Sequence, residues 1–145
     1  MMNRDILNKC IEIACSAHAR QVDKSGLSYI LHPLYVMGQV KTERAKCIAV
    51  MHDVIEDNPD YDGEILIMNG IPKDIANSVL VLTRDFNVRY FDYIDSIKES
   101  RDLDIIAVKI EDLKHNMDIT RLKVVTNKDL NRLQKYHKAL RILED

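Results

Sequence analysis

Three carboxylates and one imidazole lie within a stretch of six residues near the middle of the chain. His52 and Asp53 are adjacent, and Glu56 and Asp57 each follow four residues after one of them. Because residues four apart share one face of an α-helix, this spacing predicts that the four side chains converge on one spot. Buried charges are costly unless they pair with each other or bind a metal. The segment therefore indicates a divalent-metal site with two further carboxylates for proton transfer.

His32 is a candidate third ligand. It precedes Pro33, and proline is favoured at the first position of a helix, so a helix is expected to begin at Pro33 with His32 as its N-cap. Histidine is a poor N-cap compared with serine or aspartate, which suggests that its ring has another role. A loop histidine without a ligand role is the alternative.

Asp112 is a candidate fourth ligand. It lies on a helix expected over residues 103–117, whose first half is apolar almost all round and therefore central. Lys109 and Asn116 share its face, so an ordinary Lys109–Asp112 ion pair explains the pattern as well as a metal ligand does. His115 lies off that face and is expected at the surface.

Together these residues form a mixed set of two imidazoles and two carboxylates: His32, His52, Asp53 and Asp112. Such a set suits Mn²⁺, Fe²⁺ or Zn²⁺ better than a thiolate-bound metal or an all-oxygen Mg²⁺ site. A divalent metal polarises a phosphoryl oxygen and lowers the pKa of a bound water, and Glu56 and Asp57 could take and return the proton. Three cations could neutralise phosphate charge: Lys24, Arg84 and Lys109. The reaction class that follows is metal-assisted hydrolysis of a phosphate ester or anhydride.

The elements that must position these residues are all expected to be helical, because apolar residues recur at helical spacing along the chain. Helices are expected over residues 5–21, 33–40, 45–57, 62–68, 72–82, 89–99 and 103–117, with a last one that begins at 127. The helices over 45–57 and 103–117 are expected to be central. The fold class is therefore all-α, a single-domain helical bundle over residues 1–145.

Composition limits the possible partners. The chain has 145 residues and a net charge of −2, and its acids and bases are interspersed, which argues against broad nucleic-acid binding. It contains no signal-peptide pattern and no apolar run that could span a membrane, so a cytoplasmic protein with a small-molecule substrate is expected. Cys10, Cys15 and Cys47 form no Cys-x-x-Cys pair, and we interpret them as small buried residues in a reducing compartment. The oligomeric state stays open.

Beyond the metal-site residues, a longer series of motifs occurs in order over residues 5 to 120. These motifs are Ala17-His18, Gln21, Lys24-Ser25-Gly26, Tyr29-Ile30, His32-Pro33, the run His52 to Asp57, Leu82-Thr83-Arg84, Val108-Lys109, Asp112-Leu113 and His115-Asn116-Met117. The His52-Asp53 doublet with His32 and Asp112 resembles the HD-domain phosphohydrolases. The full series more closely resembles the hydrolase domain of the RelA/SpoT group, the (p)ppGpp 3′-pyrophosphohydrolases, including the small stand-alone ones.

This resemblance implies an HD-domain architecture and a role for each matching residue. It implies Mn²⁺ held by His32, His52, Asp53 and Asp112. Glu56 and Asp57 would position or activate the attacking water, and the nucleotide would be contacted by Lys24, Ser25 and Asn116. The implied reaction converts guanosine 3′-diphosphate 5′-(di/tri)phosphate to GDP or GTP plus pyrophosphate.

Two departures from the family pattern affect the expected substrate. Asp23 stands where the family usually has an arginine that would stack on the base, and Asp118-Ile119 stands where it often has Arg-Thr. Both changes remove a cation near a polyanionic substrate. Three hypotheses therefore stay open: (p)ppGpp hydrolysis, hydrolysis of a different nucleotide or small phosphorylated metabolite, and a non-catalytic nucleotide-binding module. A helical protein with only ordinary core ion pairs would require coincidences at several ordered positions.

Overall fold

The computed structural model describes residues 4–145, and every regular element within them is helical apart from an isolated bridge between Val22 and Ser28. The α-helices are α1 (Arg4–Ala17), α2 (Leu31–Gln39), α3 (Glu43–Met51), α4 (Val54–Asp57), α5 (Gly63–Met68), α6 (Lys73–Leu82), α7 (Tyr90–Glu99), α8 (Leu103–Asn116) and α9 (Asn127–Glu144). A short 3₁₀ turn, η1 (Ile119–Arg121), lies between α8 and α9. The all-α fold class expected from the sequence is confirmed.

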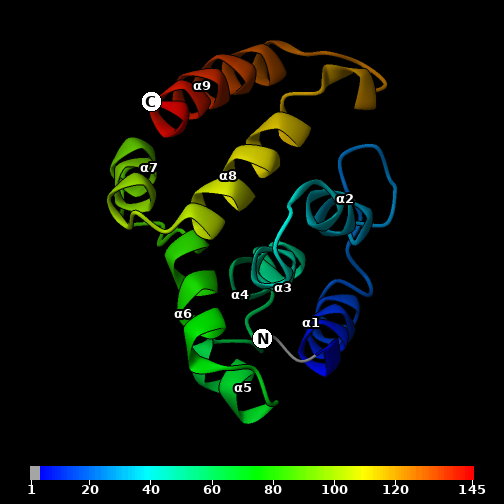
Figure 1. Ribbon diagram of the computed structural model, residues 1–145. Coiled ribbons are helices and arrows are strands. Elements are labelled where there is room, and N and C mark those ends of the chain that lie inside the picture. The colour runs from blue at the N-terminus through cyan, green and yellow to red at the C-terminus, as the bar shows by residue number, and fades with distance from the viewer. Residues whose placement is uncertain (1–3) are drawn as a thin grey trace.

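Helix α3 lies at the centre of the bundle and packs against α1, α2, α6 and α8 (Figure 1). Its buried residues are Ala45, Cys47, Ile48, Ala49, Val50 and Met51. Thr42 caps the helix by accepting a hydrogen bond from the backbone N–H of Ala45, as Thr N-caps usually do. Because residues 47–51 of α3 are fully buried, whatever lies at its C-terminal end is held within the core.

The expectation of one continuous helix over residues 45–57 is wrong, because α3 ends at Met51 and α4 begins at Val54. The last turn tightens at His52, whose N–H donates to the carbonyl of Ala49 at 3.3 Å, three residues back. Asp53 follows with φ −103° and ψ 0°, in the bridge region of backbone conformations. This break keeps His52 and Asp53 at the buried end of α3, and it carries Glu56 and Asp57 to a more open position.

Two other helix boundaries also differ from the expectations. Helix α1 ends at Ala17 instead of residue 21, and α2 begins at Leu31, so His32 is inside the helix and is not its N-cap. Pro33 is the third helical residue, where its missing N–H costs little because the first turn of a helix leaves its N–H groups unpaired in any case. Of the three cysteines expected to be buried, Cys15 is exposed.

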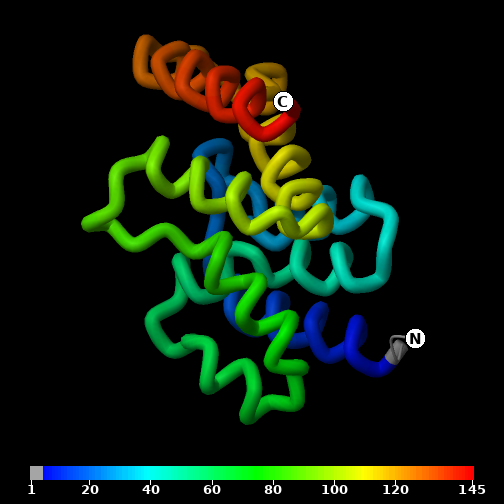
Figure 2. Tube along the Cα trace, turned by 60° about the vertical axis from the view of Figure 1, so that its left-hand side comes forward, coloured from blue at the N-terminus to red at the C-terminus, as the bar shows by residue number. Residues whose placement is uncertain are grey.

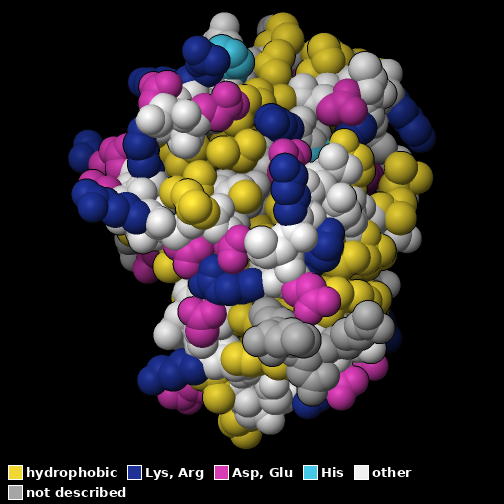
Figure 3. All heavy atoms as spheres, in the orientation of Figure 1, with side chains coloured by type: hydrophobic (Ala, Val, Ile, Leu, Met, Phe, Trp, Pro, Cys, Tyr) yellow, Lys and Arg dark blue, Asp and Glu magenta, His cyan; other side chains and the backbone are white. Residues whose placement is uncertain are grey.

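Helix α9 lies across one end of the bundle, against α7 and α8 and far from α5 (Figures 1 and 2). Thr126 and Asp129 form a reciprocal capping box at its start. Acidic and basic side chains are interspersed on the face shown in Figure 3. None of the helices within residues 4–145 is both long and apolar enough to cross a membrane.

Candidate active site

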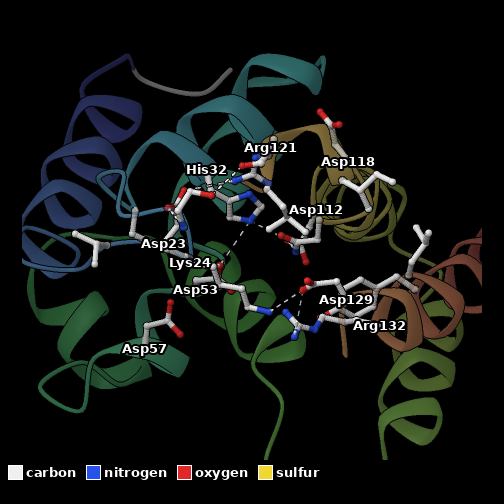
Figure 4. Close-up of a pocket in the computed structure, with 18 of the residues that line it drawn as sticks. Asp23, Lys24, His32, Asp53, Asp57, Asp112, Asp118, Arg121, Asp129 and Arg132 are labelled. Atoms are coloured by element: carbon white, nitrogen blue, oxygen red, sulfur yellow. Dashed lines mark hydrogen bonds and ion pairs between the residues drawn. The ribbon is translucent and has the colours of Figure 1, made fainter. Parts of the chain in front are cut away.

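The four expected metal ligands come together from three places along the chain. His32 comes from α2, His52 and Asp53 from the α3–α4 junction, and Asp112 from α8, and one ligand atom of each lies within 4.8 Å of the others. The His52 Nε2 atom lies 3.1 Å from Oδ2 of Asp53 and 3.3 Å from Oδ1 of Asp112. Figure 4 shows His32, Asp53 and Asp112 pointing toward one another beside the cavity. The sequence prediction that these residues cluster is therefore correct in geometry.

The hydrogen bond made by the other ring nitrogen of His52 determines what its Nε2 can do. Nδ1 lies 2.6 Å from the Ala49 carbonyl, and a carbonyl only accepts, so Nδ1 carries the proton. In the neutral ring Nε2 therefore presents a lone pair, and it is buried without a hydrogen-bond partner among the described residues. Three lone pairs, from His52, Asp53 and Asp112, thus face a common point, and only a cation or an extra proton can stabilise that arrangement.

Without a cation, the cluster stabilises a proton on His52. Burial lowers the pKa of His52, but the Asp53 and Asp112 carboxylates raise it by more, so its pKa lies well above the ordinary value. For Asp53, burial raises the pKa and the nearby imidazolium lowers it more strongly, to about 2. The residues present fit a divalent metal, because they supply two nitrogen and two oxygen donors and a histidine whose other nitrogen is fixed by a backbone carbonyl.

His115 contributes to this site, contrary to its expected surface position. Its Nδ1 lies 2.7 Å from Nδ1 of His32, and the two rings stack with centroids 5.0 Å apart and planes 5° apart. Tyr35 stacks on the His115 ring as well, at 4.0 Å. Burial lowers the pKa of His115 to about 4, with smaller contributions from Arg121 and His32. A neutral His115 can accept a proton from His32 Nδ1, and in that tautomer the lone pair of His32 lies on Nε2, the atom that is 2.9 Å from Oδ1 of Asp112 in the cluster.

The remaining carboxylate positions are satisfied by neighbouring donors. Asp112 accepts from Lys109 Nζ at 2.9 Å and from Asn116 Nδ2 at 2.9 Å. Asp53 accepts from the hydroxyl of Tyr29. The alternative of an ordinary Lys109–Asp112 ion pair is therefore present in the structure, and it coexists with the cluster instead of replacing it.

A cavity of about 400 Å³ opens beside the cluster (Figure 4). Of the residues expected to act on or bind the substrate, those that line it are Glu56, Asp57, Lys24, Ser25, Lys109 and Asn116. Arg84 is not among them and lines an adjoining smaller cavity of about 140 Å³. One wall of the larger cavity is the loop over residues 22–28, where Gly26 adopts φ +82° in a tight turn.

Glu56 and Asp57 are accessible from the larger cavity, and each is held by a neighbour. The backbone N–H of Arg84 donates to Glu56 Oε1 at 2.8 Å, and Gln21 Nε2 donates to Asp57 Oδ2 at 3.0 Å. His18 Nδ1 lies 2.7 Å from Oε1 of Gln21 and fixes that amide. Enclosure by the protein raises the pKa of both carboxyl groups, and the Asp53 charge adds to the increase. Raised pKa values suit groups that exchange protons near neutrality.

The two acidic departures at positions 23 and 118 both line the cavity but are engaged in local structure. Asp23 Oδ1 accepts from the backbone N–H groups of Ser25 and Leu27, at 2.8 and 3.0 Å. Asp118 caps η1 through the backbone N–H of Thr120 at 3.1 Å. Their carboxylates therefore stabilise the cavity wall, which is a structural reason for aspartate at both positions.

Sequence reasoning did not identify the cations that the C-terminal part of the chain contributes to this cavity. Arg121 from η1 lies 3.9 Å from Asp23, and Arg132 from α9 lies 3.9 Å from Asp129. Asp129 also lies 3.8 Å from Lys24, so α9 reaches across to the 22–28 loop (Figure 4). The polar stripe of α9 was the available signal, but nothing in the sequence says which part of the molecule that stripe faces.

No protein-family model matches the chain. Among curated proteins, it is similar to one from Spiroplasma citri named guanosine-3′,5′-bis(diphosphate) 3′-pyrophosphohydrolase, with 33% identity over 127 residues that cover 77% of this chain and 16% of that protein. A protein of the same name from Haemophilus influenzae is 29% identical over 116 residues, covering 72% of this chain and 17% of that protein. A Myxococcus xanthus protein named GTP pyrophosphokinase is 27% identical over 128 residues, which cover 78% of this chain and 17% of that protein. The chain thus spans about a sixth of the length of these relatives.

Among solved structures, the chain matches one described as "A metazoan ortholog of SpoT hydrolyzes ppGpp and plays a role in starvation responses". The TM-score is 0.77 at 17% identity, covering 99% of this chain and 87% of the other. This match confirms the HD-domain architecture expected from the sequence. The two comparisons together confirm the resemblance: the chain has the fold of a SpoT ortholog and is related to one segment of proteins named guanosine-3′,5′-bis(diphosphate) 3′-pyrophosphohydrolase.

Proposed function

We propose that this chain is a metal-dependent phosphohydrolase that converts guanosine 3′-diphosphate 5′-(di/tri)phosphate to GDP or GTP plus pyrophosphate. The observation that carries the proposal is the position of His52 Nε2, a buried atom that faces two carboxylates beside a cavity. That arrangement favours a bound cation next to space for a substrate. The names of the relatives supply the substrate.

The ligands of the proposed metal are His32, His52, Asp53 and Asp112. We propose Mn²⁺ as the ion, with Fe²⁺ and Zn²⁺ as alternatives, because a mixed nitrogen and oxygen donor set suits all three. When bound, such an ion supplies Lewis acidity toward a phosphoryl oxygen and lowers the pKa of water.

Glu56 and Asp57 are the proposed proton-transfer groups. A water oxygen bonds to the inner phosphorus of the 3′-diphosphate, the bond from that phosphorus to the ribose 3′-oxygen breaks, and pyrophosphate is released. One carboxylate accepts the proton that the water loses, and the 3′-oxygen takes up a proton as it leaves. Carboxyl groups with raised pKa values can serve in both directions, and these two lie next to the ligand Asp53 in sequence and along the same cavity wall.

Substrate phosphates and the nucleoside are proposed to contact the cavity wall at Lys24, Ser25, Lys109, Asn116 and, from the adjoining cavity, Arg84. Lys24 is 54% exposed and its 3.8 Å approach to Asp129 is a long, weak pairing, so its ammonium is free to move to a phosphate.

The test is hydrolysis of ppGpp by protein that is stripped of metal with a chelator and reloaded separately with Mn²⁺, Fe²⁺ or Zn²⁺. Release of GDP and pyrophosphate, restored best by Mn²⁺ and absent from the Asp53→Ala variant, is expected. Reloaded protein that binds Mn²⁺ yet releases no pyrophosphate would contradict the proposed reaction.

A second candidate is hydrolysis of a different nucleotide. It is favoured by Asp23 and Asp118, which line the cavity where the family pattern has arginine. A panel of ppGpp, its adenine analogue and simple 3′-phosphorylated nucleosides separates the two candidates by relative kcat/KM. Tight nucleotide binding by Mn²⁺-loaded protein with no turnover of any member would instead favour a non-catalytic nucleotide-binding module.

A further inference from the structure

The smaller cavity adjoins the larger one, and five residues line both: Glu56, Lys109, Asp112, Asn116 and Tyr136. Its other walls come from the segment after α6, from α7 and from α9, and these contribute Arg84, Tyr90, Tyr93 and Lys135. A single buried water needs about 10–15 Å³, so a volume of about 140 Å³ can accommodate a phosphoryl group. The smaller cavity is thus a side chamber next to the candidate metal cluster.

This side chamber contains more positive than negative charge. Lys109 is neutralised by Asp112, at 2.9 Å, which leaves Arg84 and Lys135 against the single carboxylate of Glu56. Within residues 4–145 neither Arg84 nor Lys135 has a carboxylate within 4 Å as an ion-pair partner. The Arg84 side chain donates only to the Val88 carbonyl, at 3.1 Å.

Both cations are held against the same aromatic ring. The guanidinium of Arg84 lies 5.6 Å from the centroid of Tyr90, and the ammonium of Lys135 lies 4.5 Å from it. Two cations at one ring repel each other unless an anion lies near them. Burial lowers the pKa of Lys135, and the charges of Arg84 and other nearby cations lower it further.

Tyr90 adds an unused hydrogen-bond donor. Its hydroxyl is buried and has no partner among the described residues. A buried hydroxyl without a partner is destabilising, and it donates well to an anion. Two unpaired cations and one unpaired donor therefore line a chamber of phosphate size.

We propose that Arg84, Lys135 and Tyr90 form an anion subsite that receives the outer phosphoryl group of the pyrophosphate produced at the metal cluster. This inference rests on the proposed function, because that reaction produces pyrophosphate. Glu56 lines both cavities, so a diphosphate whose inner phosphorus lies near Glu56 can extend its outer phosphorus into the chamber.

The experiment is direct binding of inorganic pyrophosphate to the Mn²⁺-loaded protein by isothermal titration calorimetry, with inorganic phosphate and GDP as separate ligands. Lys135→Met is expected to raise the Kd for pyrophosphate about tenfold and to leave the Kd for GDP unchanged. Methionine keeps the apolar stem that covers Tyr90. Tyr90→Phe removes only the hydroxyl and is expected to weaken pyrophosphate binding severalfold.

The matched control is Lys138→Met. Lys138 is also on α9, and its ammonium lies 4.6 Å from the ring centroid of Phe91, but it does not line the chamber. Equal pyrophosphate affinity in wild type, Lys135→Met and Lys138→Met would overturn the subsite, and so would a loss of GDP affinity instead of pyrophosphate affinity in Lys135→Met. Binding is measured without turnover, so the two proposals can fail separately. If the protein does not hydrolyse ppGpp but its pyrophosphate affinity depends on Lys135, only the proposed reaction is contradicted. If the protein hydrolyses ppGpp but its pyrophosphate affinity does not depend on Lys135, only the subsite is contradicted.

Discussion

Helix α3 has an aspartate cluster at each end. At the N-terminal end Arg44 forms ion pairs with three aspartates, and at the C-terminal end His52 lies against two. The Arg44 guanidinium donates to Asp74 and to Asp102, each at 2.8 Å, and to Asp104 at 3.0 Å. Its Nη2 also donates to the Ser78 hydroxyl at 3.0 Å. Each of these carboxylates has a permanent cation as its partner, and the cluster ties α3 to α6 and α8 without needing any further group.

Among residues 4–145, no permanent cation faces the centre of the cluster at the other end. Its imidazoles are titratable, and Lys109 reaches only the outer oxygen of Asp112. The side chain of Arg44 is 25% exposed whereas that of His52 is 3% exposed, so solvent screens the first cluster much more than the second. Aspartate therefore serves structure at the Arg44 end, where each carboxylate already has a permanent cation as its hydrogen-bond partner and solvent screens the remaining charge; we call this end balanced in that sense, although one guanidinium faces three carboxylates. At the His52 end, which we call unbalanced, the buried carboxylate oxygens that face the centre have only titratable imidazoles opposite them among the described residues, which is the arrangement expected of a binding site.

The largest effect is expected from removing one charge at the unbalanced end. Asp53→Asn keeps the side-chain volume but takes away a ligand, and we expect turnover of ppGpp to fall on the order of a thousandfold, with weakened Mn²⁺ binding. Steady-state kinetics and metal titration measure the two effects. The exposed Asp60→Asn serves as control and should change neither. Normal activity of the Asp53→Asn protein would contradict the functional role proposed for the cluster around His52.

The next effect concerns the carboxylates beside the cluster. Glu56→Gln is expected to lower kcat on the order of a hundredfold while Mn²⁺ affinity changes little, because we propose Glu56 as a proton-transfer group and not as a ligand. Burial raises the pKa of Glu56 and Asp57, and a base must be ionised, so wild-type turnover should decline with falling pH at a higher pH than for an ordinary carboxylate. A pH–rate profile checks the direction. The exposed Glu64→Gln should leave both kcat and the profile unchanged.

At the balanced end the expected effect is on stability instead of chemistry. Arg44→Met should lower the free energy of unfolding by about 2 kcal/mol, roughly thirtyfold in the unfolding equilibrium, because three neighbouring carboxylates lose their shared partner. Arg89→Met breaks an exposed pair with Asp92 and is expected to have no measurable effect. Urea titration of metal-free protein measures the difference. Reduced Mn²⁺ affinity in folded Arg44→Met would show that the two ends are not independent.

The same variant makes a prediction about pH. The hydrogen bonds from Arg44 lower the pKa of Asp102. A carboxyl group whose pKa is lowered by folding contributes stability above its unfolded pKa and loses it as the pH falls through the folded value. The stability difference between wild type and Arg44→Met should therefore narrow below about pH 4.

The helices and the convergence of the four ligands could be predicted because both depend on local spacing. Apolar periodicity defines the helices, and the adjacency of His52 and Asp53 brings them to one helix end. The break after Met51 could not be predicted, since the helical pattern continues through it. At the break the ring of His52 bonds the Ala49 carbonyl three residues earlier while its Nε2 faces Asp112 of α8, a tertiary neighbour that the helical pattern does not reveal.

The residues that were missed are those whose neighbours come from distant parts of the chain. The helical spacing of α8 predicts that His115 lies off the face of Asp112 and at the surface. In the structure α2 packs against α8 there, and His32 and Tyr35 stack on the His115 ring. Likewise Arg132 and Lys135 face the two cavities only because α9 packs across α7 and α8. Helix packing, and not helix formation, was the information that the sequence lacked.

The smallest effect is expected from changing a neighbour of the unbalanced cluster and none of its proposed ligands. His115→Phe keeps a flat ring stacked on His32 and Tyr35 but removes the nitrogen that accepts from His32 Nδ1, so the Nε2 lone pair of His32 is no longer fixed toward the cluster. Substituting such orienting partners typically costs about 10–100-fold in metal affinity, and we expect the lower end because the stacking survives. Competition against a chelator measures the Mn²⁺ affinity, with the exposed His137→Phe as control. If both variants bind Mn²⁺ as wild type does, His115 only fills space between α2 and α8, and the unbalanced cluster is held by its own residues, as the Arg44 cluster is.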